Sequence, residues 1–409
     1  MDGVSFFANP IRFFQSVHDP TINLVLVMVL IWTTGVLFRK IKQPPVLGEL
    51  LAGIIFGPAL LNVIRPDHTM EVLSELGVFF LMFHAGLETN PYDLKKMGRQ
   101  AVLVGAGGFL VPFGAGVLVS SLLFDLSLIH SLFVGLGLSI TAIAVNVRVL
   151  HDLNMYDYRV TPVIIGAAII DDVLCFAFFS VIVGFAATNS LDWLEMVINM
   201  IKVFGFFGLS IGLGKFLFPR ISHFFSSREA KGFTFSLIVA LLFGLLSELA
   251  GLHIIIGAYM AGLFIGDTIR HQPLYQKIND RFVAITYGFL GPIFFVSLSF
   301  HMKFQIFQTH LGLLLTLLTV AILGKLIGAG LGGWFGGLNW AESSVVGFAM
   351  NGRGAVELII ASVGLELGII DDVFFSLLVV VAFLTTLIPP VALTFLLGKA
   401  PIKRAILEK

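Results

Sequence analysis

The sequence predicts an all-α integral membrane protein with about 13 transmembrane helices. Of the 409 residues, 57% are hydrophobic and 12% are charged, whereas charged residues make up about a quarter of an ordinary soluble domain. Apolar runs of about 18–25 residues recur along the chain, and each is long enough to cross a hydrocarbon core as a helix. The formal net charge is zero and no basic tract is present, which argues against nucleic acid as a partner. The expected partner is the lipid bilayer.

Each predicted span begins where a charged or turn-forming segment gives way to an apolar run. In chain order the spans cover residues 21–38, 44–62, 71–87, 101–124, 128–147, 160–187, 194–217, 232–249, 253–269, 283–301, 311–337, 343–363 and 372–397. The fifth and twelfth spans are interrupted by polar residues and glycines, in "GLSITAIA" from Gly137 and "GFAMNGRG" from Gly347. We expect the helix to break within these two spans.

The distribution of basic residues predicts the orientation of the chain. With the N-terminus outside, 19 of the 25 lysines and arginines fall in inner loops. Cytoplasmic loops of membrane proteins are enriched in these residues. We therefore expect the N-terminus outside and the C-terminus in the cytoplasm, with Lys325 and Arg353 lying inside spans.

Two pairs of matching segments predict an internal repeat. "GELLAGIIFG" (Gly48–Gly57) and "GAYMAGLFIG" (Gly257–Gly266) share G-x-x-x-A-G-x-x-x-G at an offset of 209. Similar helix-packing faces would explain this match alone. However, the two interrupted spans match at an offset of 210. One linker span between two sets of six gives the halves opposite orientation, so we expect two inverted-topology six-helix repeats, which are typical of secondary transporters.

The motif "IIDDV" occurs twice, and its first copy lies deep in a span. Asp171 and Asp172 are about 11 residues into the sixth span, or roughly 16 Å at the rise of an α-helix. An ionised carboxylate near the membrane midplane is costly and marks a functional site by default. Neighbouring helical residues point in different directions, so one carboxylate can face a protein partner while the other faces water. A buried pair with a purely structural role is the alternative.

The second copy of the motif begins a helix. Asp371 and Asp372 follow the loop-like "GLELG" and precede the apolar run of the thirteenth span. The offset of 210 aligns Asp371 with Thr161, which we expect to cap the helix of the sixth span. We expect the second aspartate pair to cap its helix and complement the helix dipole.

Three further charged residues lie within spans. Lys325 is deep in the eleventh span, where a lysine must deprotonate, reach the interface or find a partner. In the repeat, the eleventh span corresponds to the fourth, which lies two spans before the aspartates. Lys325 can therefore pair with Asp171. Arg353 and Glu357 are four residues apart in the twelfth span and are expected to form an intrahelical pair with a structural or gating role.

Several segments carry a resemblance to a known family. They are "KQPPVLGELLAGIIFGP", "FLMFHAGLE", "LSITAIAVNVRVLHDL", "GAAIIDDV", "GPIFFVSL" and "NGRGAVELIIA", together with Lys325 in the eleventh span. In this order they resemble the monovalent cation:proton antiporter superfamily, in the branch of bacterial sodium/proton exchangers (the second cation:proton antiporter family). The resemblance covers most of the chain.

The resemblance implies a dimerisation domain, a core ion-translocation domain and a homodimer. Residues 1–100 (spans 1–3) and 232–305 (spans 8–10) would form the dimerisation domain. Residues 101–190 (spans 4–6) and 306–409 (spans 11–13) would form the core, and residues 191–231 the linker span. The interrupted helices would cross beside the aspartates, and the core would slide in an elevator-type alternating-access movement.

The resemblance also implies an electrogenic exchange of two protons for one Na⁺ (or Li⁺). Asp172 would be the main cation ligand and Asp171 would pair with Lys325, itself a candidate proton carrier. Thr141 and Ser139 would support the ion site, so that Asp172, Asp171 and Thr141 hold Na⁺. Burial opposes ionisation of a carboxyl group and a nearby ammonium favours it, so proton and cation compete for the same oxygens. No cofactor is expected.

Alternatives to sodium/proton exchange stay open at this point. A K⁺/H⁺ antiporter would use the same fold, and a sodium-coupled organic-anion symporter a related one. A membrane-embedded enzyme is disfavoured because no nucleophile motif, P-loop or paired-cysteine metal motif is present. A non-transporting sensor is disfavoured because no soluble output domain is evident. We expect a multi-pass protein of the inner (plasma) membrane of a bacterium.

Overall fold

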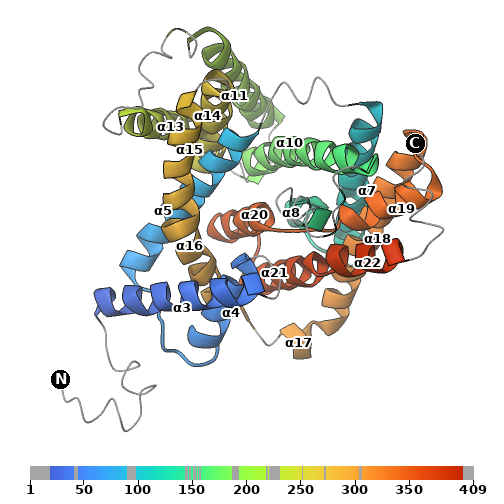
Figure 1. The fold of residues 1–409 in the computed structure, drawn as a ribbon, viewed down its shortest axis with the longest axis horizontal. Helices are drawn as coiled ribbons and strands as arrows, with labels where there is room; N and C mark the ends of the chain where they lie inside the picture. The colour runs from blue at the N-terminus through green and yellow to red at the C-terminus, as the bar shows by residue number, and fades with distance from the viewer. Residues whose placement is uncertain are drawn as a thin grey trace. The chain divides into compact units, whose positions relative to one another are not determined.

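The computed structural model describes most of the chain. The described residues are 19–40, 45–89, 98–142, 146, 149–150, 153, 155, 158–186, 193–217, 220, 231–250, 252–270, 273–303 and 306–398. Over these residues the protein consists of helices and their connections, and no β-strand occurs in them (Figure 1). The all-α prediction is confirmed.

The chain divides into two compact units, and the first contains residues 1–88, 208–248 and 254–304. Its helices, in chain order, are α3 (Pro20–Lys40), α4 (Pro45–Phe56), α5 (His68–Glu88), the π-helix η1 (Leu213–Leu217), α13 (Lys231–Leu249), α14 (Ile254–Ile269), α15 (Pro273–Ile285), the π-helix η4 (Thr286–Leu290), α16 (Gly291–Leu298) and the 3₁₀ helix η5 (Ser299–His301). Within this unit, glycines let α5 and α14 pack closely: a Cβ atom at Gly262 would collide with the carbonyl oxygen of Phe83.

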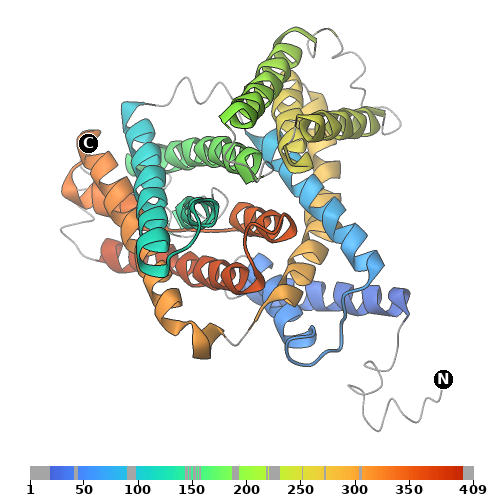
Figure 2. The same ribbon diagram turned by 180° about the vertical axis from the view of Figure 1, so that it is seen from behind.

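The second unit contains residues 89–207, 249–253 and 305–409. Its helices are α7 (Arg99–Phe124), α8 (Leu128–Ser139), α10 (Val160–Ala186), α17 (Ile306–Thr309), α18 (Leu311–Phe335), α19 (Trp340–Ala349), α20 (Ala355–Glu366), α21 (Asp372–Thr386) and α22 (Ile388–Gly398), and α11 (Trp193–Gly212) crosses the boundary between the units in sequence. In this unit the short helices α8 and α20 lie between α10 and α21, as both Figure 1 and Figure 2 show.

Every predicted span contains helix in the structure, but the helices differ in length. Over the described residues, eight helices are long and apolar enough to cross a membrane. The seventh span contains α11, and the other predicted spans contain shorter or interrupted helices. The tenth span was predicted to begin at residue 283, yet its helix begins at Pro273. The first turns of this helix carry Lys277, Asp280 and Arg281, so their composition hides the helix when hydropathy alone is considered.

Close backbone contact fixes α18 against α7 in the second unit. A Cβ atom at Gly328 would collide with the carbonyl oxygen of Gly107, and one at Gly332 with that of Leu103. Small residues at helix interfaces allow this approach in membrane proteins. Because Lys325 lies one turn before Gly328, this packing sets the position of the lysine.

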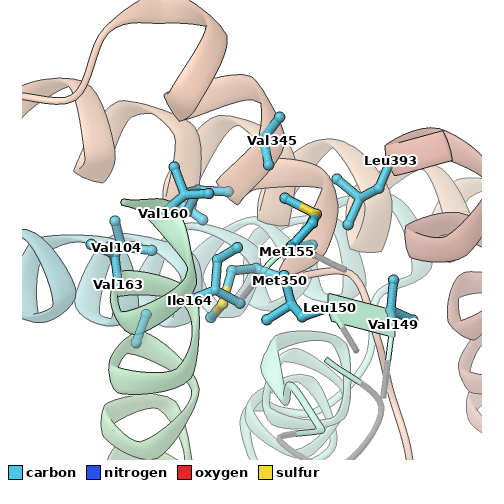
Figure 3. Packing of buried hydrophobic residues seen from close by; sticks show 14 of the residues in the cluster. Val104, Val149, Leu150, Met155, Val160, Val163, Ile164, Val345, Met350 and Leu393 are labelled. Carbon is cyan, nitrogen blue, oxygen red and sulfur yellow. The ribbon is translucent and has the colours of Figure 1, made fainter. Parts of the chain in front are cut away.

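A hydrophobic cluster packs several helices of the second unit together around the same region. Figure 3 shows its members converging from α7, α10, α19, α22 and the segments that follow α8 and α19; they include Val104, Val149, Leu150, Met155, Val160, Val163, Ile164, Val345, Met350 and Leu393. All of these side chains are buried. The helix that carries the first aspartate pair, α10, is therefore packed against both interrupted regions.

The predicted cap at the second "IIDDV" is confirmed. Asp371 is the N-cap of α21, with extended backbone, and its carboxylate accepts a hydrogen bond from Phe374 N at 2.9 Å. The matching prediction for Thr161 is wrong. Helix α10 begins at Val160, and the Thr161 hydroxyl donates to Met155 O at 2.5 Å instead of capping the helix.

We expect Asp371→Ala to lower the free energy of unfolding by about 1 kcal/mol, because it removes an N-cap acceptor. Asp371→Asn keeps a side-chain oxygen that can accept the same hydrogen bond and is the matched control. Thermal unfolding of the purified variants in detergent measures the difference. Equal stability of the alanine variant and the wild type would show that the cap does not stabilise α21.

Candidate functional site

Two helix breaks lie side by side in the second unit. Helix α8 ends at Ser139 and the chain continues extended at Ile140, while α19 ends at Ala349, 210 residues later. Ala142 N donates to Gly352 O at 2.8 Å, and the Thr141 hydroxyl donates to Met350 O at 3.0 Å. Unwound backbone is tolerated at membrane depth only where such contacts or a cavity satisfy it.

A buried ion pair joins this crossing region to α10 and α18. Lys325 Nζ lies 3.0 Å from Asp171 Oδ1 and 3.1 Å from Asp171 Oδ2. The same ammonium donates to the Thr141 hydroxyl at 2.5 Å. Lys325, Asp171 and Thr141 are all completely buried. Charges taken out of water are tolerated when they are paired and hydrogen-bonded, and both conditions are met here.

The two adjacent aspartates have different environments. Asp171 is fully buried against Lys325, whereas Asp172 is half-buried as a residue, and its Oδ1 atom is buried without a hydrogen-bond partner. Consecutive residues of a helix point about 100° apart, which separates the two carboxylates. The pair therefore offers one carboxylate that is neutralised by an ammonium and one with a buried oxygen that has no hydrogen-bond partner among the described residues.

The oxygen atoms here are of the kind that hard cations prefer: two carboxylates, a hydroxyl and a backbone carbonyl. They belong to Asp171, Asp172, Thr141 and Met350. Over the residues that the structure describes, no group of three or more His, Cys, Asp or Glu side chains could hold a metal ion. The donor set suits a weakly held alkali cation better than a resident transition metal.

Comparison with known proteins identifies the family. The model of the family described as "Sodium/hydrogen exchanger, transmembrane" matches residues 24–399. The chain belongs to this family. It is 33% identical to the Na(+)/H(+)-K(+) antiporter GerN of Bacillus cereus over 378 residues, which cover 92% of this chain and 96% of that one. It is 31% identical to the Na(+)/H(+) antiporter of Enterococcus hirae, over 92% of this chain and 98% of that one.

A solved structure supports the fold of this family member. The sodium proton antiporter MjNhaP1 from Methanocaldococcus jannaschii superposes with a TM-score of 0.73 at 20% identity, covering 94% of this chain and 98% of that one. The family match, the two relatives and this fold together confirm the resemblance to the cation:proton antiporter superfamily and the prediction of a multi-pass membrane protein. The named relatives are antiporters rather than enzymes.

In this sodium/hydrogen exchanger family member, Arg353 connects the two helix breaks. Its Nη1 donates to Gly137 O at 2.6 Å and to Glu357 Oε1 at 3.1 Å, and its Nη2 donates to Leu138 O. Carbonyls at the C-terminal end of a helix have no partner within the helix and carry a partial negative charge. Arg353 therefore neutralises the end of α8 while pairing with the first turn of α20.

The Arg353–Glu357 pair exists, but the prediction that it is intrahelical is wrong. Helix α20 begins at Ala355, with Gly354 as its N-cap, so Arg353 lies outside the helix. Spacing by four residues suggested one continuous helix. The break turns the guanidinium toward α8, and residue spacing within one span does not reveal this.

The remaining predicted residue, Ser139, is buried at the end of α8. Its hydroxyl donates to Leu136 O at 2.7 Å, within its own helix. Sequence reasoning also missed two groups, the carbonyl of Met350 and the hydroxyl of Thr386, which donates to Arg353 O at 2.9 Å. Every residue has a carbonyl, so residue type cannot single out that of Met350. Thr386 is a polar residue within the apolar run of α21, and this position could have marked it as a candidate.

We expect Thr141→Val to reduce transport and to destabilise the protein by about 1–3 kcal/mol, because it removes a buried hydrogen-bond partner of the Lys325 ammonium. Valine is close to threonine in shape, so the hydroxyl is the main difference. Thr141→Ser keeps the hydroxyl and should retain most of the activity. Unfolding in detergent and flux in proteoliposomes measure both effects; a valine variant equal to wild type in both would contradict a role for the hydroxyl.

Proposed function

We propose that this protein exchanges Na⁺ or Li⁺ for H⁺ across the plasma membrane. The observation that carries the proposal is the fully buried Lys325–Asp171 ion pair, bonded to Thr141 at a helix break and adjacent to Asp172, whose Oδ1 atom is buried. The names of the similar antiporters from B. cereus and E. hirae support the same activity.

Competition for the same oxygens is sufficient to couple the two ions. Asp172 is the main cation ligand in this proposal, with Asp171 and Thr141 completing the site. Either the cation or protons neutralise the carboxylates, since uncompensated charge is costly in a desolvated site. Asp171 can accept a cation only if the Lys325 ammonium moves away or loses its proton, so Lys325 takes part in the exchange. The groups titrate together as one site.

The stoichiometry in this proposal is two protons for one sodium ion, so each cycle moves one net charge. The twin aspartates and the lysine provide enough titratable groups for two protons. Transport should consequently respond to a membrane potential, which an exchange of one proton for one cation would not.

Alternating access requires that one part of the protein moves relative to another. In the proposal the second unit is the ion-carrying core and the first unit is the dimerisation domain of a homodimer. The N-terminus is outside and the C-terminus cytoplasmic, and the core moves as an elevator. The division of the chain into two compact units and the burial of Asp171, Lys325 and Arg353 within the second unit support these roles.

A pH-sensitive dye in proteoliposomes tests the function. We expect Na⁺ and Li⁺, added to vesicles with a preformed proton gradient, to collapse the gradient, with a rate that changes when valinomycin and K⁺ set the membrane potential. Choline is the negative control. If none of the alkali cations changes the dye signal of well-folded protein, the proposed exchange is excluded.

K⁺/H⁺ exchange at the same site is a second candidate, because the similar protein GerN is named as a Na(+)/H(+)-K(+) antiporter. Potassium shares the charge of sodium and needs a larger ring of oxygens. The dye experiment separates the candidates when K⁺ is the added cation and the potential is set without it. A response to K⁺ that equals the response to Na⁺ would favour a protein of mixed specificity.

A further inference from the structure

The turn between α18 and α19 presents three exposed aromatic side chains. Trp334 and Trp340 stack with ring centroids 5.4 Å apart and an interplanar angle of 23°, and Phe335 lies 5.0 Å from Trp334. Their exposed fractions are 43% for Trp334, 64% for Phe335 and 67% for Trp340. Tryptophan is enriched at membrane–water interfaces, where one part of the ring is apolar and another is polar.

The backbone of this turn is firmly built. Gly337 has φ +93°, which favours glycine. Asn339 caps α19 by accepting from Glu342 N at 2.9 Å, while the Glu342 carboxylate accepts from Asn339 N at 2.8 Å. This capping box and the left-handed glycine fix the direction in which Trp340 leaves the turn.

The position of the aromatic side chains matches the depth of a lipid headgroup region. Trp334 lies nine residues after Lys325, or roughly 14 Å along α18. Trp340 lies nine residues before the end of α19 at Ala349, again roughly 14 Å. Half of a typical hydrocarbon core is about 15 Å. With the ion pair and the helix break at the midplane, both helices are therefore long enough to reach the edge of the hydrocarbon layer.

Basic residues flank the same turn. The start of α7 packs on it, since a Cβ atom at Gly336 would lie 3.0 Å from Gln100 Cα, and the neighbouring Arg99 is exposed. Arg159 is half exposed, and its Nη1 atom lies 3.6 Å from Glu342 Oε1. The Glu342 carboxylate therefore balances the charge of Arg159. Among the residues that the structure describes at this turn, Arg159 and Glu342 balance each other and Arg99 adds a positive charge.

We propose that this turn is a lipid-binding site for anionic phospholipid. Trp334, Phe335 and Trp340 lie among the headgroups and upper acyl chains of one leaflet, and Arg99 binds the headgroup phosphate. The contact involves the α18–α19 hairpin, which carries Lys325 and ends at the break that Thr141 contacts. The lipid site does not depend on which cation the protein transports.

Tryptophan fluorescence tests the depth. The chain has four tryptophans, so the full-length variant Trp32→Phe/Trp193→Phe leaves Trp334 and Trp340 as reporters. In proteoliposomes, phospholipid brominated near the headgroup should reduce its emission more than phospholipid brominated near the chain end. The matched control variant keeps only Trp32, which is 68% exposed in the middle of α3. Its emission should be reduced more by the phospholipid brominated near the chain end than by the one brominated near the headgroup. Stronger quenching of Trp334 and Trp340 by the deep bromines would overturn the proposal.

The headgroup preference is tested with the same reporter. A minor fraction of brominated phosphatidylglycerol in phosphatidylcholine vesicles should quench more than an equal fraction of brominated phosphatidylcholine. Arg99→Gln should remove this excess and leave the depth dependence intact. Equal quenching by the two lipids before the substitution, or an excess that survives Arg99→Gln, would overturn the assignment of an anionic phospholipid to Arg99.

Discussion

Asp172→Asn should reduce sodium-dependent proton release in proteoliposomes to the level of protein-free vesicles. Asparagine has nearly the same shape but cannot carry the negative charge that attracts the cation or the proton that the cation displaces. The Asp172 carboxylate is lost while the Lys325–Asp171 ion pair stays in place. The measurement is the dye response to added Na⁺ at equal amounts of reconstituted protein.

The chain provides its own matched control for this prediction. Asp372→Asn makes the same change in the second "IIDDV", at the start of α21, and exchange should be retained. Wild-type exchange in Asp172→Asn, or loss of exchange in a well-folded Asp372→Asn, would contradict the assignment of the first copy as the ion site.

Lys325→Met should lower the free energy of unfolding by about 3–5 kcal/mol, because it leaves the carboxylate of Asp171 buried without its partner charge. Methionine fills most of the volume of the lysine stem, so the loss of charge dominates over a cavity. Chemical unfolding in detergent gives the difference between the variant and the wild type. Exchange in proteoliposomes should be strongly reduced as well.

A double variant separates the charge from the packing. Asp171→Asn/Lys325→Met has no unpaired charge, and we expect it to recover much of the lost stability without recovering exchange. If the double variant is as unstable as Lys325→Met, the unpaired carboxylate of Asp171 is not the source of the lost stability.

Much of the fold could be predicted from the sequence, because apolar length is a strong signal in a membrane. The starts of α10, α18 and α21 agree with the predicted spans to the residue. The signal fails where a helix continues beyond the apolar run, as in α15 with Lys277 and Asp280. It is also weak where a helix stops early: α4 ends at Phe56, six residues before the predicted end of the second span.

The candidate site was less predictable, because its geometry depends on two breaks that lie far apart in sequence. Asp171 and Asp371 occupy the same place in identical motifs, yet they lie at different depths in their spans, and this difference in depth is enough to separate their roles. The contact between Lys325 and Asp171 followed from the order of the spans. The contacts of Arg353 with the carbonyls of Gly137 and Leu138 did not, because the end of α8 is defined only by the folded backbone.

The most direct test of sodium/proton exchange follows both ions in the same vesicles. With an outward proton gradient and no other energy source, radiolabelled sodium should accumulate against its own gradient, and a protonophore should abolish the accumulation. Asp172→Asn vesicles should show only passive leak. Sodium accumulation that persists in the presence of the protonophore, or its absence in vesicles that contain well-folded wild-type protein, would contradict the exchange of sodium for protons.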